Sequence, residues 1–334
     1  MKSDLDMTTR TPRDAGLALN GLGFDRVVPP GGYRWWYIDG FSECGQFGVT
    51  VIAFIGSVFS PYYFRARRRG DVAPENHVSL NVVLYGSRCA RWCMTERGRD
   101  SLVQHPDQLI IGSSHVSVTN DRLIIYIEER SAPFMRRVSG RIEVSFGTWV
   151  DKCFGLDGSG NHWWWPIAPL ASINVSMDCP SLCWNGSAYV DSNFGAEPIE
   201  NGFSSWNWCR GHSTEGGCEI HYDAQLKGGG EKRLSMMIDQ EGCLTPFDSP
   251  SLYHLPVGAI WRVARPARIE FSETPLIRTL EDTPFYTRSQ IQTRGAGGRC
   301  FMHESLDLNR FCQPWVQSLL RFRMPRREIS QVAS

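Results

Sequence analysis

The sequence predicts a mainly β protein built from two antiparallel barrel or sandwich domains with few helices. Most of the chain consists of short runs rich in Val, Ile, Tyr and Phe that Gly, Pro, Asn, Asp and Ser separate, which is typical of strands joined by turns. Helical periodicity is confined to one segment near the C-terminus. A large all-β chain avoids exposed sheet edges by closing or stacking its sheets, so we expect barrels or sandwiches.

The first expected strand is the strongly apolar run 49–55, and the last ends at residue 271. One hairpin can be placed, because Asn120 and Asp121 suit the positive φ of a tight turn. After this pair Leu123, Ile125 and Ile127 alternate with polar residues, as in a half-buried strand. The expected strands are residues 49–55, 77–86, 109–119, 122–130, 137–146, 172–177, 217–224, 233–239, 259–264 and 267–271.

The C-terminal region holds the one helix that we expect. Trp315, Leu319 and Phe322 fall at positions i, i+4 and i+7, the spacing of one helix face.

The chain has 334 residues, and at roughly 100–200 residues per domain two domains are expected. Proline-containing stretches at 165–170 and 178–184 are candidates for the connection between the two β domains, since proline has no N–H to donate to a neighbouring strand. The expected parts are a disordered leader 1–22, an N-terminal β domain 23–180, a C-terminal β domain 181–293 and a tail 294–334.

Composition and charge exclude several classes of protein. The 35 basic and 35 acidic side chains balance, whereas nucleic-acid binders need a basic excess. Eleven scattered cysteines indicate reduced thiols rather than a disulfide framework. The pairs Cys89/Cys93 and Cys179/Cys183 lack partners at zinc-ligand spacing, so no metal is expected. No nucleotide-binding, serine-hydrolase or zincin motif occurs, and no cofactor is expected.

Targeting and membrane signals are also missing from the sequence. The leader carries charges but no apolar stretch of the kind that a signal peptide needs. The most apolar run, from Phe47 to Phe59, has 13 residues, against the roughly 20 that a spanning helix requires. Two arginine clusters adjoin apolar residues and are interpreted either as membrane-surface patches or as a solvated loop and tail. They comprise Arg65, Arg67, Arg68 and Arg69, and Arg321, Arg323, Arg326 and Arg327.

A candidate acid lies in a segment crowded with aromatic residues. Six of the 12 tryptophans fall between residues 163 and 208. Asp191, in "AYVDSNFG", is surrounded by Tyr189, Val190 and Phe194, and keeping a carboxyl group from water raises its pKa. Such a group can act as a general acid. The alternative is an Asx turn at the end of a strand.

A proton donor among aromatic rings suits one reaction in particular, the protonation of an electron-rich C=C bond. The resulting carbocation is stabilised by ring faces, by about 2 kcal/mol or more when water is excluded. His162, in "NHWWW", can take the proton of an attacking water or hold Asp191 in its protonated form. A structural histidine with backbone partners is the alternative.

Six blocks of sequence resemble the carotenoid 1,2-hydratase family, also called hydroxyneurosporene synthase, of purple photosynthetic bacteria. They are "ECGQFGVTVIAFIGSVFSPYY", "HVSLNVVLYG", "WCMTERG", "GNHWWWPIAP", "AYVDSNFGAEPIENGFSSWNW" and "LEDTPFYTRS". The resemblance runs from about Gly23 to about Thr293, and the leader and the tail lack a recognised counterpart. It implies a lipocalin-like fold and hydration of the terminal C1=C2 bond of acyclic carotenes such as neurosporene and lycopene, without a cofactor.

The resemblance also implies the residues of the site. The family's catalytic residues match Asp191, Tyr189, His162 and Trp164. If Trp164 faces the carbocation, strand alternation turns its two neighbours to the opposite face. Rings expected to bind the substrate are Trp163, Trp165, Phe194, Trp206 and Trp208.

A carotene is longer than the interior of a closed barrel of about eight strands. We therefore expect a cleft or tunnel that opens toward the membrane, with the protein attached peripherally to the cytoplasmic side of the bacterial inner membrane. Two other functions stay open. One is a non-catalytic isoprenoid-binding protein of lipocalin type, and the other is a polyene cyclase or isomerase on the same fold.

Overall fold

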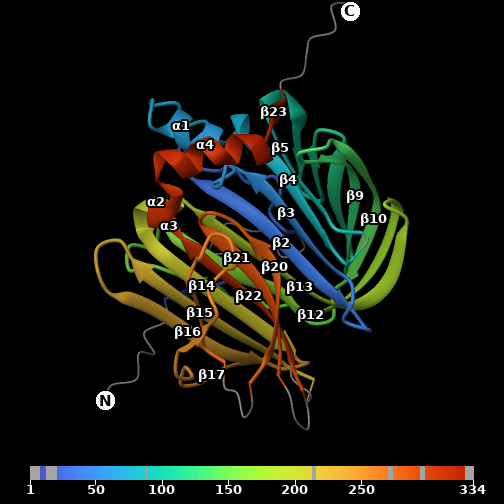
Figure 1. Ribbon diagram of the computed structural model, residues 1–334, viewed down its shortest axis with the longest axis vertical. Coiled ribbons are helices and arrows are strands. Elements are labelled where there is room, and N and C mark those ends of the chain that lie inside the picture. Colours follow the sequence, from blue (N-terminus) through green and yellow to red (C-terminus); the bar gives the residue numbers. More distant parts are fainter. Residues whose placement is uncertain are drawn as a thin grey trace, which may run out of the picture. The chain divides into compact units, whose positions relative to one another are not determined.

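The computed structural model describes residues 8–12, 21–87, 89–212, 216–269, 274–293 and 298–327. The chain forms two compact units. Unit 1 comprises Met1–Pro198 and Ser318–Ser334, and unit 2 comprises Ile199–Gln317. Antiparallel strands dominate both units (Figure 1), which confirms the mainly β prediction. The expected domain boundary at residue 180 lies in the turn between two long strands of unit 1.

Unit 1 is built on one large sheet whose strands follow the order β23-β5-β4-β3-β2-β13-β12-β10-β9-β8-β7-β6, with β11 and β1 attached beside β12. Among the strands in the described ranges, β23 alone is parallel to its neighbour, β5. The strands are β1 (Thr9–Arg10), β2 (Tyr33–Ser42), β3 (Gly48–Ile55), β4 (Val78–Tyr85), β5 (Arg91–Arg97), β6 (Leu102–His105), β7 (Gln108–Ile111), β8 (Ser114–Thr119), β9 (Arg122–Ser131), β10 (Arg136–Ser145), β11 (Cys153–Gly155), β12 (His162–Cys179), β13 (Leu182–Gly195) and β23 (Arg326–Arg327).

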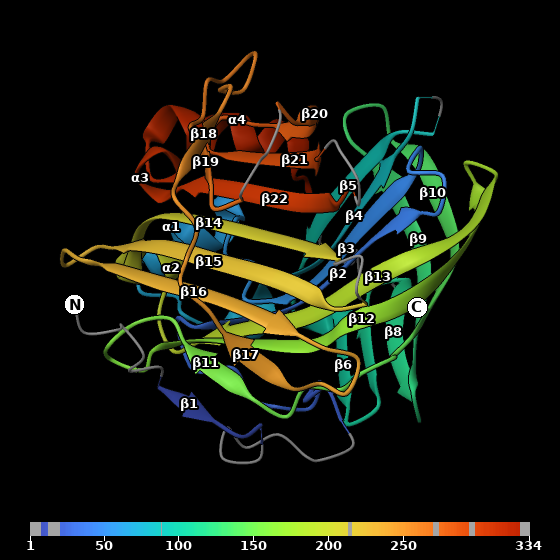
Figure 2. The same ribbon diagram turned by 90° about the horizontal axis from the view of Figure 1, so that it is seen from below.

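This sheet curls back on itself into a half-barrel (Figure 2). The curl brings β5 against β9, strands that lie far apart in the sheet order. Arg97 of β5 forms an ion pair of 2.8 Å with the buried Glu129 of β9, and the backbone N–H of Ala132 donates to the carbonyl of Trp92. Burial raises the pKa of the Glu129 carboxyl, although Arg97 opposes the shift.

The central strands of unit 1 are buried on both faces. One face forms the main hydrophobic core, which includes Trp36 and Ile38 of β2 and Val190 of β13. The other face of β2 carries Trp35 and Tyr37, which are also buried. Every residue of β2, β3 and β4 is buried, and a strand buried on both faces shows no alternation of apolar and polar residues. Residues 33–42 were not predicted as a strand, whereas the equally buried β3 and β4 were.

Unit 2 is built on a second antiparallel sheet, in the order β17-β16-β15-β14-β22-β21-β20, together with the small β18-β19 ribbon. One of its hydrophobic clusters consists of Cys209, Leu255, Ala267, Ile269, Ile291 and Phe301. The strands are β14 (Phe203–His212), β15 (Cys218–Leu226), β16 (Glu231–Ile238), β17 (Leu244–Pro246), β18 (Tyr253–Leu255), β19 (Arg265–Ala267), β20 (Leu276–Asp282), β21 (Tyr286–Gln292) and β22 (Cys300–Asp307).

The helices are short. In α1 (Pro61–Arg67), the Ser60 hydroxyl caps the helix by accepting from the N–H groups of Tyr62 and Tyr63, and a proline at the first position suits a helix start. The other helical segments are η1 (Pro74–Asn76), η2 (Arg99–Ser101), α2 (Ile199–Gly202), α3 (Leu308–Phe311) and α4 (Pro314–Arg323). Within the described part of the chain, none of the helices combines the length and the apolar character needed to cross a membrane.

Helix α4 confirms the helix predicted near the C-terminus, but the stripe that predicted it points outward. Val316 and Leu320 are buried, whereas Leu319 is 40 % exposed and Phe322 is 80 % exposed. The first residue of the stripe, Trp315, is exposed as well and stacks on Trp261. The helix therefore has apolar residues on two faces, of which one is buried.

Most predicted strands are confirmed, including the hairpin in which Thr119 pairs with Arg122. The predicted strand 109–119 is divided between β7 and β8. The prediction for 259–264 is wrong, because residues 259–261 form a turn and residues 262–264 have no regular secondary structure. The N–H of Arg262 donates to the carbonyl of Gly258, and Arg262 has a positive φ of 55°, which a strand does not allow. Of the predicted strand 267–271, residue 267 ends β19, and residues 270–271 lie outside the described residues.

Candidate active site

The long strand β12 carries two bulges next to the predicted acid. Residues 166–167 of β12 lie opposite Asp191 alone, and residues 169–170 lie opposite Tyr189 alone. Each bulge begins with a proline, which fits because proline has no N–H for a ladder hydrogen bond. Bulges are frequent beside active sites, where they reorient side chains. The "WPIAPL" stretch is thus an irregularity within a strand, positioned across from both residues.

Three of the four predicted catalytic residues meet at one carboxyl group. The Trp164 indole N–H and the Tyr189 hydroxyl each donate to Oδ2 of Asp191, both over 3.0 Å. All three side chains are buried. Because Oδ2 already accepts two hydrogen bonds, a proton on this carboxyl group belongs on Oδ1. The two donors also fix the plane of the carboxyl group.

His162 lies two residues before Trp164 on the same face of β12. Its Nδ1 is 3.0 Å from the Tyr33 hydroxyl, and its Nε2 is 3.4 Å from Oε1 of Glu197. Gly195 pairs with both His162 and Tyr33 across the sheet. A Cβ at this glycine would lie 2.6 Å from the Tyr33 ring and 2.9 Å from His162 Nδ1. The glycine therefore gives the two side chains the room to meet.

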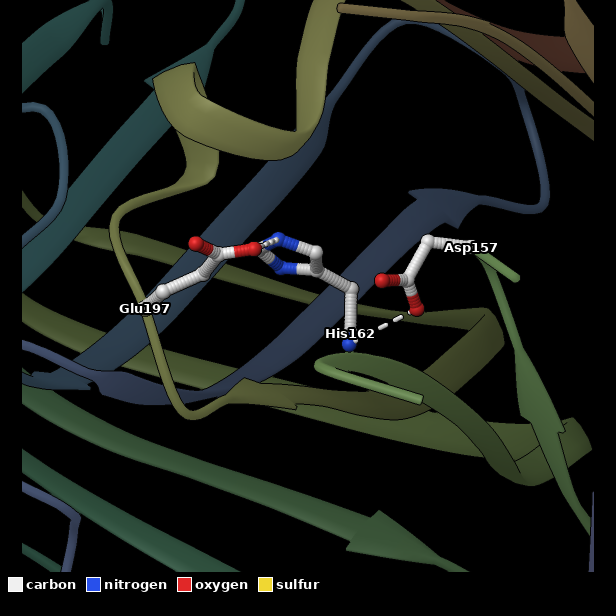
Figure 3. A group of neighbouring side chains, drawn as sticks. All are labelled: Asp157, His162 and Glu197. Carbon is white, nitrogen blue, oxygen red and sulfur yellow. Dashed lines mark hydrogen bonds and ion pairs between the residues drawn. The ribbon is translucent and has the colours of Figure 1, made fainter. Parts of the chain in front are cut away.

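Asp157, His162 and Glu197 each offer one atom that could bind a metal ion. These three atoms lie within 4.8 Å of one another. Figure 3 shows the imidazole pointing toward Glu197, while Asp157 approaches the backbone of His162. Asp157 accepts from the N–H of His162, from the Ser159 hydroxyl and from the N–H of Asn161. The Asn161 side chain donates to Glu197. These hydrogen bonds account for the positions of both carboxylates.

The neighbouring strand β2 repeats the Tyr-x-Asp motif of β13. The Tyr37 hydroxyl donates to Oδ2 of Asp39 over 2.9 Å, as Tyr189 does to Asp191. In the antiparallel register Tyr37 lies opposite Asp191, and Asp39 lies opposite Tyr189. The sheet face therefore carries two buried carboxyl groups, each held by the tyrosine two residues before it.

An aromatic layer extends from this face along β2 and β3. Tyr33 stacks on Trp35 at a ring separation of 4.9 Å, and Trp35 also contacts Phe54 and Phe59. The sequence prediction missed these residues together with Tyr37 and Asp39. The signal was present in "YRWWYID", where aromatic residues at 33, 35 and 37 are followed by an aspartate at 39, all on one side of a strand.

Three of the rings predicted to bind substrate lie on the opposite face of the sheet. Trp163 and Trp165 belong to the main core, and Phe194 packs against it, as alternation predicted for the two neighbours of Trp164. The indole N–H of Trp163 donates to Gly160 O, and that of Trp165 to Val150 O.

Trp206 and Trp208 belong to β14 of unit 2. Trp206 packs against Tyr222 at a ring separation of 4.9 Å. Trp208 lines a small cavity of this unit together with Asp223 and His303.

The fold and the site define a mainly β, lipocalin-like protein with a buried acid beside a layer of aromatic rings. The sequence model of the carotenoid hydratase CrtC family matches residues 51–333. The chain belongs to this family. The match includes most of the C-terminal tail, for which the sequence analysis had no counterpart.

Several curated relatives cover most of the chain. The acyclic carotenoid 1,2-hydratase of Thiocapsa roseopersicina is 45 % identical over 92 % of this chain and 76 % of its own length. The protein of the same name from Rubrivivax gelatinosus is 40 % identical over 91 % and 76 %. That from Cereibacter sphaeroides is 35 % identical over 83 % of this chain and 98 % of its own length.

Two solved structures share the fold. A putative AttH from Nitrosomonas europaea superposes with a TM-score of 0.55 and 12 % identity, over 83 % of this chain and 92 % of that one. CghA with Sch210972 superposes with a TM-score of 0.51 and 10 % identity, over 90 % and 98 %. At this identity the likeness concerns the fold alone.

Proposed function

We propose that this protein adds water across the terminal C1=C2 bond of acyclic carotenes such as neurosporene and lycopene, giving tertiary 1-hydroxy carotenoids. Membership of the carotenoid hydratase family supports the reaction class. The observation that supports the assignment of the acid is the buried Asp191 carboxyl group, held by Trp164 and Tyr189 through one oxygen.

The first step is protonation of the alkene. Neutral Asp191 donates its proton from Oδ1 to C2, the π electrons form the new C–H bond, and a tertiary cation develops at C1. Trp164 and Tyr189 keep the carboxyl group oriented and present ring faces to the cation. A positioned acid contributes typically about 10²–10⁴-fold to a rate, so cation stabilisation and positioning must supply the remainder.

The second step is addition of water to C1. The oxonium ion that forms must lose a proton, and we assign this proton to His162, with the Tyr33 hydroxyl as the relay to Nδ1. The Glu197 carboxylate near Nε2 stabilises the resulting imidazolium. Return of a proton from His162 through solvent to Asp191 restores the starting state, so that H and OH are added and no other group is consumed.

The wider set of aromatic residues stays a prediction for substrate binding. Trp206 and Trp208 of unit 2 are proposed as substrate-binding residues. Trp163, Trp165 and Phe194 are proposed to support binding from behind, because they pack under the strands that carry His162, Trp164 and Asp191.

Peripheral attachment to the cytoplasmic side of the bacterial inner membrane is part of the proposal. A long hydrocarbon such as a carotene resides in the apolar phase of a bilayer. An enzyme that takes one end of it gains from residing at the membrane surface.

The test is incubation of the purified protein with lycopene or neurosporene in water enriched in ¹⁸O. The expected product is heavier than the substrate by one labelled water. Binding without any product would favour the carrier function, and an isomeric product without label would favour a cyclase or isomerase. Either result would contradict hydration.

A further inference from the structure

We propose that unit 1 carries a docking face for an anionic lipid bilayer, formed where helices α1 and α4 present exposed residues. The inference rests on the proposed function, since a carotene substrate is dissolved in a bilayer. This docking face is defined by Leu319, Arg321 and Phe322 of α4 and by Arg65, Arg68 and Arg69 at the end of α1.

The apolar part of the docking face, Leu319 and Phe322, is separate from the buried side of α4. Within unit 1, the buried side of the helix is supplied by Leu320 and, just beyond the helix, Met324. Leu319 and Phe322 lie on the other side, and Phe322 is 80 % exposed. A short helix needs one apolar stripe to fold onto a sheet. Exposure of one ring does not by itself indicate a partner, but Leu319 and Phe322 are three positions apart and lie together on one side of the helix, with Arg321 and Arg323 as their sequence neighbours.

The two arginine clusters, more than 250 residues apart in the sequence, converge on one histidine. The guanidinium of Arg67 lies 4.2 Å from the centre of the Tyr63 ring, and this ring stacks on His77 at 4.7 Å. His77 Nδ1 in turn lies 3.2 Å from Arg326, three residues beyond the end of α4. Figure 1 shows α1, α4 and β23 at the same end of the sheet.

The charge at this end is strongly unbalanced although the whole chain is neutral. Eight arginines fall within residues 65–69 and 321–327. Against them, the sequence has Asp71 and Glu75 between residues 60 and 76, and Glu328 directly after the second cluster. Glu96 is buried and already paired with Arg326 and His77. The surface therefore presents positive charge, which is complementary to anionic lipid headgroups.

The combination of residues favours a bilayer over other partners. Aromatic and aliphatic side chains flanked by cations are typical of helices that lie in the membrane interface, where the apolar groups enter the acyl region and the cations contact phosphates. Arginine stems can lie along apolar groups while their charged ends reach the headgroups. A flat basic surface for a nucleic acid would not need Phe322.

Vesicle flotation with the full chain tests the docking face. The parent protein should bind phosphatidylcholine vesicles that contain phosphatidylglycerol more strongly than vesicles without it. The double variant Leu319→Ser, Phe322→Ser should bind about tenfold more weakly. A variant with Arg65, Arg68, Arg69 and Arg321 all changed to Gln should lose the preference for phosphatidylglycerol and the sensitivity to salt.

The matched control is Phe134→Ser. Phe134 lies in the turn between β9 and β10 of the same unit and is 78 % exposed, almost as much as Phe322. This variant should bind vesicles as the parent does. Thermal melting of all variants should match the parent, because the changed side chains are exposed. Vesicle binding that is unchanged in the double variant, or lost equally in the control, would overturn the docking face.

Hydration assays separate this proposal from the proposed function. With lycopene in detergent the double variant should equal the parent, and with lycopene in vesicles it should be slower by about the same factor as its binding. An equal loss of hydration rate in detergent would contradict a docking role. A change of oligomeric state in size-exclusion chromatography would also contradict it, because the face would then bind a second copy of the chain. If the parent is inactive in detergent as well, the proposed function fails, while flotation still decides the docking face.

Discussion

Asp191 of β13 lies directly opposite Tyr37 of β2, and two residues further along Asp39 lies opposite Tyr189. The two strands run antiparallel, so the tyrosine of each Tyr-x-Asp motif lies beside the aspartate of the other motif. Both carboxyl groups are buried, and each accepts a hydrogen bond from its own tyrosine. The indole N–H of Trp164 also donates to Asp191. The motif alone therefore does not identify the acid, and the contact with Trp164 supports Asp191.

Asp191→Asn and Asp39→Asn form a matched pair that tests this assignment. Both changes keep the shape of the side chain and remove the ability to donate an acidic proton. We expect Asp191→Asn to reduce the hydration rate of lycopene by at least about 10²-fold, and Asp39→Asn to reduce it far less. The measurement is product formation followed by chromatography and mass. A large loss in Asp39→Asn alone would assign the acid to β2.

The two donors to Asp191 are expected to act on the rate more than on folding. Tyr189→Phe removes one hydrogen bond to Oδ2 and leaves the ring, which we expect to cost about tenfold in rate, equivalent to a hydrogen bond of roughly 1.5 kcal/mol. Tyr37→Phe makes the same change in the twin motif and should cost less. Both variants should melt within a few degrees of each other. Equal effects on rate would show that the donors serve the sheet rather than the acid.

The loop around Asp157 offers a test of whether a metal ion belongs beside His162. Three hydrogen bonds converge on the Asp157 carboxylate, and Asn at this position cannot accept all of them. We expect Asp157→Asn to lose about 1–3 kcal/mol of unfolding free energy, measured by urea titration. Dialysis against a chelator should leave the hydration rate of the parent unchanged. A rate that falls with the chelator and returns with added zinc would instead make these residues metal ligands.

The sequence was informative where the site depends on neighbouring strands. Trp164, Tyr189 and Asp191 come from β12 and β13, which are joined by a short turn. They were assigned to one site by the resemblance to the family, and the crowding of aromatic residues around Asp191 supported that assignment. Tyr33, Trp35, Tyr37 and Asp39 were missed because β2 pairs with β13 across about 150 residues. The register of such a pairing is fixed by packing rather than by local preference.

The same limit applies to the helix and to the charged clusters. The spacing of Trp315, Leu319 and Phe322 predicted α4 correctly, but periodicity does not say which of two apolar faces will be buried. That choice depends on the surface against which the helix packs. Likewise, Arg67 and Arg326 come together around His77 only in the folded unit. The sequence of either arginine cluster does not predict this contact.

A last prediction concerns the stability of the protein in acid. His303 of β22 is fully buried, and its Nε2 lies 2.9 Å from the carbonyl of Pro266. The pKa of His303 is lowered to about 4, mainly by burial and also by the nearby Arg265, although the hydrogen bond with the Pro266 carbonyl acts in the opposite direction. In the unfolded chain a histidine has a pKa near 6.5. Between these values the unfolded state binds a proton that the folded state does not, so the free energy of unfolding should fall as the pH is lowered from about 6.5 to about 4.

The slope from this one group is at most about 1.4 kcal/mol per pH unit. The check is guanidinium unfolding from pH 7 to pH 4.5 of the parent and of His303→Gln, whose amide can still donate to Pro266. The variant should be less stable than the parent at pH 7, and the gap should narrow toward pH 4.5, because only the parent has a buried imidazole that resists protonation. His254→Gln, a change at an exposed position, should keep the slope of the parent. A gap that stays constant with pH would mean that His303 takes up its proton without unfolding.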